Sequence, residues 1–213
     1  MAGKYLLLLA LAAFCATAQA SEYHVSAFST EGLGGWETKK FKGTNEYSLV
    51  HDDGRTVVKA VSKGTASGLF KKVKLDPQSF RYLRWSWKIA GTIKNGDETT
   101  KAGDDYAARV YIVFPGHFFW QTKAINYIWA NRLARGEAIP NAFTSHAMML
   151  AVESGSERAG QWITEERDIL ADYRRLFGGE PREIGAIAIM TDTDNTGGEA
   201  TAWYGDITIS TAR

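Results

Sequence analysis

Residues 80–90 alternate strictly between apolar and polar side chains. The apolar positions are Leu83, Trp85, Trp87 and Ile89, and the polar positions between them are Tyr82, Arg84, Ser86 and Lys88. A period of two over this length is typical of a β-strand with one buried and one solvated face. The segment therefore predicts a sheet that packs its tryptophan side on a core.

Further strands are predicted from similar patterns, separated by turn residues. Asp53-Gly54 lies between two β-prone runs and predicts a hairpin, because Asp and Gly tolerate positive φ. A short helix is predicted at 170–177, where apolar residues have helical spacing before Gly178-Gly179. The predicted strands cover residues 47–50, 56–61, 69–75, 80–90, 106–114, 124–130, 145–153, 161–169, 184–190 and 200–209.

This succession of short strands predicts an all-β protein, an antiparallel β-sandwich of the jelly-roll kind with one short helix. The 7 Trp, 9 Tyr and 10 Phe agree with this class, since aromatic side chains suit a half-buried pleated surface. Alternating strand and helix units are missing from the pattern, which disfavours doubly wound and TIM-barrel folds. A lipocalin-like barrel is the competing prediction.

The first 20 residues have the pattern of a secretory signal peptide. Lys4 precedes an apolar run, and Ala18-Gln19-Ala20 forms a small-x-small cleavage site before Ser21. We therefore expect one β-sandwich domain over residues 21–213, secreted and periplasmic, with no transmembrane segment. The one cysteine, Cys15, precedes the cleavage site, so the mature chain is expected to fold without disulfides.

The charge of the chain bears on its partners. The formal net charge is +1, from 25 basic and 24 acidic residues. A chain this close to neutrality lacks the broad basic field that attracts phosphate backbones. The composition therefore disfavours nucleic acid as a partner.

Several ordered motifs together resemble a known family. They are Trp85-Ser86-Trp87, Gly103-Asp104-Asp105, Arg109-Val110-Tyr111, Asn126-Tyr127-Ile128-Trp129, Asp172-Tyr173-Arg174-Arg175-Leu176-Phe177-Gly178, and Met190-Thr191-Asp192-Thr193-Asp194-Asn195-Thr196. Taken from about Trp36 to Ile209, the chain resembles the bacterial family known as domain of unknown function 3047. The resemblance implies a secreted domain similar to the galactose-binding-like jelly rolls of carbohydrate-binding modules. It implies no established activity and no assigned catalytic residues.

The first of two acidic loops contains Asp104 and Asp105, just before a predicted strand. If the strand begins near Asp105, then Asp105, Arg109 and Tyr111 share one face. Such a patch could bind the hydroxyl groups of a sugar, with the aromatic ring stacked on it. It could also be catalytic, with an aspartate as acid or base and Arg109 on a uronate carboxylate. An ion pair that only rigidifies the strand is the third alternative.

The second acidic loop follows a buried strand and contains Asp192, Asp194 and Asn195. Its beginning resembles an EF-hand loop, but the twelfth position is Trp203 in place of a glutamate, so an EF-hand is excluded. A structural calcium ion on Asp194 and Asn195 is one alternative, and a simple turn is the other. No other cofactor is predicted.

The aromatic residues divide into core and ligand candidates. Trp85 and Trp87 are expected in the core, whereas Tyr127 and Trp129 are ligand candidates on the next predicted strand. Phe118-Phe119-Trp120 is expected either as an exposed loop tip or as a plug at the end of the sandwich. The four histidines form no zinc-binding pair, and there is no Gly-x-Ser-x-Gly elbow for a serine hydrolase.

The best functional prediction is non-catalytic binding of a glycan or polyol. The ligand patch is predicted at Asp104, Asp105, Arg109, Tyr111, Tyr127, Trp129 and Asp192. A polysaccharide lyase or glycoside hydrolase that uses the same carboxylates is the first alternative, and a structural protein of the envelope is the second. The test is whether the two acidic loops converge in one cleft.

Overall fold

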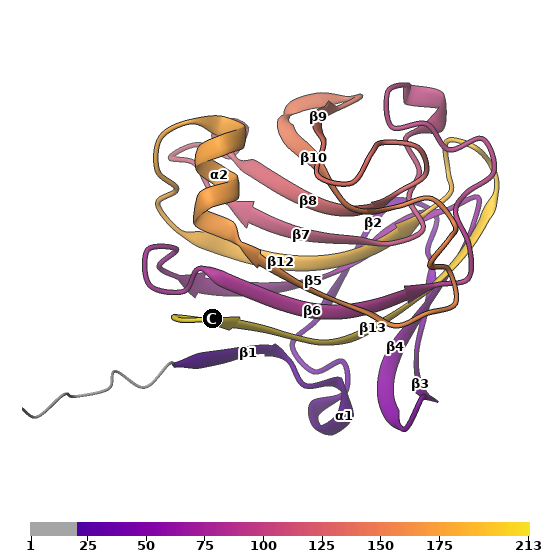
Figure 1. Cartoon of the computed structure of the whole chain (residues 1–213), viewed down its shortest axis with the longest axis horizontal. Helices are drawn as coiled ribbons and strands as arrows, with labels where there is room; N and C mark the ends of the chain where they lie inside the picture. Colours follow the sequence, from indigo (N-terminus) through magenta and orange to yellow (C-terminus); the bar gives the residue numbers. More distant parts are fainter. Residues whose placement is uncertain (1–20) are drawn as a thin grey trace, which may run out of the picture.

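Two β-sheets pack face to face around one aromatic-rich core (Figure 1). The computed structural model describes residues 21–213, so the predicted signal peptide at 1–20 lies outside the described residues. Within the described part of the chain, no helix is long and apolar enough to cross a membrane.

The six-stranded sheet has the order β11-β6-β13-β4-β3, and β1 pairs with β13 off this path. Its strands are β1 (Glu22–Ser26), β3 (Glu46–Asp52), β4 (Arg55–Lys63), β6 (Tyr82–Ile89), β11 (Ile163–Asp168) and β13 (Glu199–Ser210). All of its pairings are antiparallel.

The seven-stranded sheet has the order β2-β5-β12-β7-β8-β10-β9. Its strands are β2 (Glu37–Lys42), β5 (Ala66–Leu75), β7 (Arg109–Phe114), β8 (Lys123–Ala130), β9 (Ala138–Asn141), β10 (Thr144–Ser154) and β12 (Ile184–Asp192). The predicted β-sandwich is confirmed, and the competing barrel is excluded because, within residues 21–213, neither sheet closes on itself. One detail differs, because β10 runs parallel to β8 after the chain has crossed over through β9.

Residues 82–89 of the alternating segment form strand β6, with the apolar positions buried as predicted. Leu83, Trp85, Trp87 and Ile89 of β6 are at most 1% exposed and lie in the core between the sheets. The hairpin prediction is also confirmed, because Asp53 and Gly54 join β3 to β4 with φ values of 51° and 76°. Both angles are in the left-handed region that this turn requires.

The predicted helix is α2 (Ile169–Phe177). Asp168 caps its first turn by accepting a hydrogen bond from the Ala171 amide, and Gly178 ends it with a φ of 68°. The ring of Tyr173 packs on Phe114, 4.7 Å between centroids, so α2 covers one end of the core. Two 3₁₀ turns, η1 (Lys101–Gly103) and η2 (Phe119–Gln121), and a second helix, α1 (Phe28–Glu31), were not predicted.

Three strands, β1, β2 and β9, were not predicted from the sequence. Strand β2 is exposed along its whole length and rich in lysine, which is how proteins protect an edge strand from pairing. Strands β1 and β9 are short edge pieces of five and four residues. None of the three has the buried alternate positions that reveal the central strands.

The outer side of the seven-stranded sheet is partly covered as well. A second apolar cluster forms there from Tyr106, Ile128, Ala130, Met149 and Ala151. Ile128, Ala130, Met149 and Ala151 alternate along β8 and β10 with core residues such as Tyr127 and Leu150. The cluster borders the site described next.

Candidate functional site

The two acidic loops meet at one end of the central strands of the seven-stranded sheet. The carboxylate of Asp105 accepts hydrogen bonds from the backbone N–H of Thr196, at 2.6 Å, and of Asn195, at 3.2 Å. Strands β7 and β12 are antiparallel neighbours, so the start of one lies beside the end of the other. This pairing brings together two segments about 90 residues apart in the sequence.

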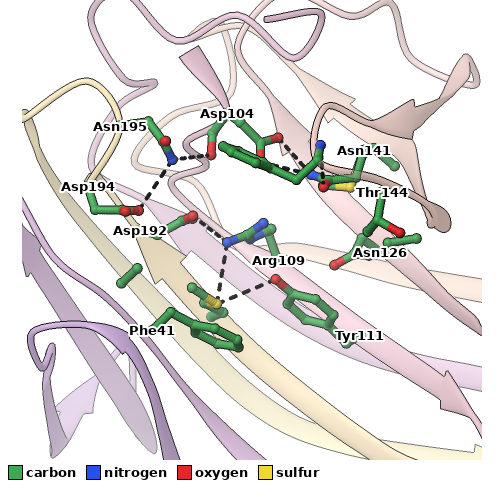
Figure 2. A pocket seen from close by; sticks show the side chains of 15 residues that line it. Phe41, Asp104, Arg109, Tyr111, Asn126, Asn141, Thr144, Asp192, Asp194 and Asn195 are labelled. Carbon is green, nitrogen blue, oxygen red and sulfur yellow. Dashed lines mark hydrogen bonds and ion pairs between the residues drawn. The ribbon is translucent and has the colours of Figure 1, made fainter. Parts of the chain in front are cut away.

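A pocket of about 340 Å³ opens on the outer side of this sheet (Figure 2). Its polar lining residues are Asp104, Arg109, Tyr111, Asn126, Asn141, Thr144, Asp192, Asp194 and Asn195. Its apolar lining residues are Phe41, Ala66, Phe143, Ala147, Met149 and Met190. The convergence that the sequence left open therefore occurs for Arg109, Asp192 and Asp194.

A buried ion pair joins Arg109 of β7 to Asp192 at the end of β12. The guanidinium Nη2 contacts Asp192 Oδ2 and lies 3.3 Å from the sulfur of Met190. The other carboxylate oxygen of Asp192 accepts the backbone N–H of Tyr106 at 3.2 Å. Both carboxylate oxygens of Asp192 therefore accept hydrogen bonds. The charged partner of the Arg109 guanidinium is Asp192, inside the protein.

Asp104 also lines the pocket and is held by side-chain hydrogen bonds. Its carboxylate accepts the hydroxyl of Tyr106 at 2.8 Å and the side-chain amide of Asn141 at 2.8 Å. Asn141 belongs to β9, the last strand of the sheet. The contact ties the first acidic loop to the β9–β10 turn.

The pocket carries an excess of acidic groups. The pKa of Asp192 is raised to about 8, chiefly by burial; the attraction of Arg109 opposes this rise, and the charges of Asp105 and Asp104 add to it. Burial and the charge of Asp105 also raise the pKa of Asp194. Burial likewise raises the pKa of the Tyr111 hydroxyl, which stays neutral and bonds weakly to the sulfur of Met190 at 3.4 Å.

Two polar atoms of the lining are buried without a partner among residues 21–213. They are the side-chain oxygen of Asn126 and the Nε of Arg109. Asn126 is 1% exposed and Arg109 is 5% exposed. A buried polar atom without a hydrogen bond costs about 1–3 kcal/mol, so each one calls for an explanation. Trp85 Nε1, Trp87 Nε1 and Glu165 Oε1 also have no partner in residues 21–213, but only Asn126 and Arg109 line the pocket.

Aromatic rings stand at the mouth of the pocket. Phe41 and Phe143 are 56% and 55% exposed, although both are large apolar residues. Lys101 lies over the ring of Phe143 at 5.3 Å. Rings at the rim and amides at the floor are the usual composition of a small-molecule site.

Two residues of the predicted patch lie elsewhere. Tyr127 and Trp129 are fully buried between the sheets, where their rings pack on Trp85 and Trp87 at 5.3 and 5.8 Å. Side chains two apart on a strand share a face, and on β8 this face is the core. The expectation that they line a ligand patch is corrected, because Asn126, the residue before Tyr127, faces the pocket instead.

Asp105 is also absent from the pocket lining, within the part of the chain that the structure describes. Strand β7 begins at Arg109, later than predicted, and the segment before it turns Asp105 toward the second loop. Asp105 therefore fixes the loops beneath the site.

The predicted calcium site remains a prediction. Oxygens of Asp105, Asp192 and Asp194 lie within 4.8 Å of one another, a grouping that could hold a metal ion. However, Asp105 and Asp192 already accept N–H donors, and Asn195 turns its amide nitrogen toward Asp105 at 3.3 Å. Donors around a carboxylate cluster compete with a cation.

Sequence reasoning missed several pocket residues, chiefly Asn126, Asn141 and Phe143. Asn126 could have been found, because it is a polar residue inside the apolar run Ala124 to Ala130. Asn141 and Phe143 lie on a short edge strand and its turn, which only the β9–β10 pairing brings to the pocket.

Solved structures with a similar arrangement of sheets were found at low identity. A mutant of a family 29 carbohydrate-binding module is 12% identical, with 92% of this chain and 88% of that chain covered and a TM-score of 0.45. The family 30 carbohydrate-binding module of a Clostridium thermocellum cellulosomal cellulase is 10% identical, with 89% and 96% covered and a TM-score of 0.47. A cellulase derived from Rhodothermus marinus is 11% identical, with 90% and 100% covered and a TM-score of 0.43.

No curated protein matches the chain. The family described as protein of unknown function (DUF3047) matches residues 34–208, which include every strand of the pocket. The chain therefore belongs to the DUF3047 family.

Proposed function

We propose that the pocket on the seven-stranded sheet binds a neutral, polyhydroxylated ligand, a sugar unit of a glycan, without changing it chemically. The observation that carries the proposal is the buried side-chain oxygen of Asn126, which lines the pocket and has no partner in residues 21–213. A ligand hydroxyl would satisfy it. The same ligand could accept a hydrogen bond from the Nε of Arg109.

The walls of the pocket suit a sugar ring. Phe41 and Phe143 present exposed rings at the rim, and Met149 and Met190 add apolar surface. A pyranose has apolar C–H faces and polar hydroxyl edges, so rings and amides together match both parts. A volume of about 340 Å³ is at the small end for ligand pockets, which fits one sugar unit.

The charges of the lining favour a neutral ligand. Arg109 is paired with Asp192, and Asp104 and Asp194 add further acidic groups. A uronate would therefore meet the acidic groups of Asp104 and Asp194 and a guanidinium that already pairs with Asp192. This disfavours the polysaccharide lyase alternative, in which Arg109 neutralises the substrate's carboxylate.

A glycoside hydrolase receives one supporting observation, the raised pKa of Asp192, which is a property of general acids. Its geometry argues for binding instead. The oxygens of Asp192 are engaged by Tyr106 and Arg109, and the nearest oxygen of Asp194 lies within 4.8 Å. A retaining hydrolase needs about 5–5.5 Å between its carboxyl groups and an inverting one about 6.5–9.5 Å, and both are longer than this separation.

A glycan array tests the proposal. The array carries neutral, acidic and amino sugars, and we expect wild type to bind neutral glycans. Asn126→Leu, which keeps the volume of the side chain and removes its amide, should lose this binding. Leu49→Ala is the control, because Leu49 is 43% exposed on β3 of the other sheet.

The outcomes separate the three functional hypotheses. Retention of the wild-type pattern by Asn126→Leu would reject the pocket as the binding site. Release of reducing ends from a bound glycan would favour the hydrolase. No binding and no turnover on any glycan would leave the structural envelope role. The secreted, periplasmic location remains part of the proposal, and fractionation of cells that express the full chain tests it.

A further inference from the structure

A second hollow continues from the pocket along the same sheet. Its volume is about 410 Å³, and it shares Thr144 and Ala147 with the first pocket. On β8, Ala124 of the second hollow lies two residues from Asn126 of the first, about 7 Å along the strand. The two hollows are therefore consecutive positions on one surface.

Small residues keep the passage between the hollows open. Ala124 and Ala147 are direct partners across β8 and β10. Neither side chain extends beyond a methyl group, so the floor between the hollows is low. A ligand that is longer than one sugar unit could lie across it.

Exposed aromatic rings border the far end of the second hollow. Phe119 and Trp120 line it and are 85% and 56% exposed, which corrects the alternative that this segment plugs the sandwich. Phe118 stacks on Trp120, with 4.6 Å between centroids and 2° between ring planes. The stack holds the indole of Trp120 as a flat platform beside the hollow.

We infer that the two hollows form one binding groove for a neutral oligosaccharide, with the Asn126 pocket holding one unit and the Trp120 platform stacking on a later one. The inference rests on the proposed function of the first pocket. The hydroxyl of Thr144 and the ring of His146 supply polar contacts between the rings. Exposed aromatic rings also suit a lipid surface, but a platform that borders a polar hollow favours a sugar chain.

The experiment compares short and long ligands. Glucose, mannose and N-acetylglucosamine are titrated into the protein, and so are the β-1,4-linked hexasaccharides of each. We expect at least one hexasaccharide to bind about tenfold more tightly than its monosaccharide. Trp120→Ala should remove this advantage and leave the monosaccharide affinity unchanged. Asn126→Leu should weaken both ligands.

The control variant is Trp203→Ala, because Trp203 lies on β13 of the six-stranded sheet and packs on Lys88. It should bind as wild type does. If a monosaccharide and its hexasaccharide bind equally and Trp120→Ala changes neither, the groove is rejected while the pocket stands. If none of the six sugars binds and the array is also empty, both proposals fail.

A vesicle-binding measurement completes the test. Wild type and Trp120→Ala are sedimented with vesicles of phosphatidylcholine and phosphatidylglycerol. We expect no difference between the two proteins. Vesicle binding that depends on Trp120, together with hexasaccharide affinities that do not, would overturn the groove in favour of a membrane contact.

Discussion

The carboxylate of Asp105 accepts the backbone N–H of Thr196 at 2.6 Å, and this contact joins the two acidic loops. It lies at the base of the site, where Asp105 is fully buried. Asp104 precedes Asp105 in the chain, Asn195 precedes Thr196, and both Asp104 and Asn195 line the pocket. The positions of these two pocket residues therefore depend on Asp105, which does not line the pocket itself.

Replacement of Asp105 by Asn should destabilise the fold. The variant keeps the shape but loses the charge that strengthens the bonds from Thr196 and Asn195. We expect a loss of about 1–3 kcal/mol in the free energy of unfolding, measured with urea. Asp53→Asn, in the exposed β3–β4 turn, is the control and should change little. Equal stability of the two variants would contradict the role of Asp105.

Asn126→Leu should preserve stability although the residue is 1% exposed. Its side-chain oxygen has no partner in the described chain, so its removal relieves a desolvation cost. The control is the same substitution at Asn45, which is 5% exposed and bonds to Ser67 and Thr65 at 2.9 and 2.6 Å. Asn45→Leu should lose about 2 kcal/mol or more. Similar losses in both variants would mean that Asn126 is structural.

Arg109→Met should destabilise the fold more at pH 8.5 than at pH 5.5. The variant leaves Asp192 without the guanidinium that favours its ionised form, so its pKa rises further and the folded state loses stability relative to wild type as the pH rises past about 8. At low pH the carboxyl group takes up a proton, because burial raises its pKa to about 8 even beside Arg109. Arg132→Met removes an exposed pair with Asp97 and should change stability little at either pH. A loss that does not change with pH would contradict the assignment.

Glu165 should make the stability of the protein depend on pH. Burial and the charge of Glu153 raise its pKa from 4.5 to about 7. The folded state therefore holds a proton that the unfolded chain releases, so the contribution of Glu165 to stability falls as the pH rises between these values. Relative to Glu165→Gln, wild type should lose about 1–3 kcal/mol between pH 4.5 and 7.5. Glu157→Gln, at an exposed position, should follow wild type throughout.

Calcium should leave the melting temperature unchanged. The oxygens of Asp105 and Asp192 already accept backbone N–H groups, and Lys42 donates to the backbone oxygen of Asp194 at 2.8 Å. Melting curves with added calcium and with a chelator are the measurement. A higher melting temperature in calcium that is lost in Asp194→Ala would instead establish the predicted metal site.

The sequence alone determined the β-sandwich, the β3–β4 hairpin and helix α2. Each depends on local rules: alternation with period two, glycine and aspartate at positive φ, and helical spacing that ends at Gly178. Local pattern also predicted Asp104, Arg109, Tyr111 and Asp192 as site residues, because charged residues beside buried strands are conspicuous and Tyr111 shares a strand face with Arg109.

Only the tertiary structure decided which of these residues form a site. Strand pairing placed the start of β7 beside the end of β12, and this joined Arg109 to Asp192. Side chains alternate between the two faces of β8, so Tyr127 and Trp129 lie in the core and Asn126 lies in the pocket. A shift of one residue reverses the face that a side chain occupies. When a strand has apolar residues on both faces, composition and spacing do not determine which face lies in the core, since that depends on what packs against each face.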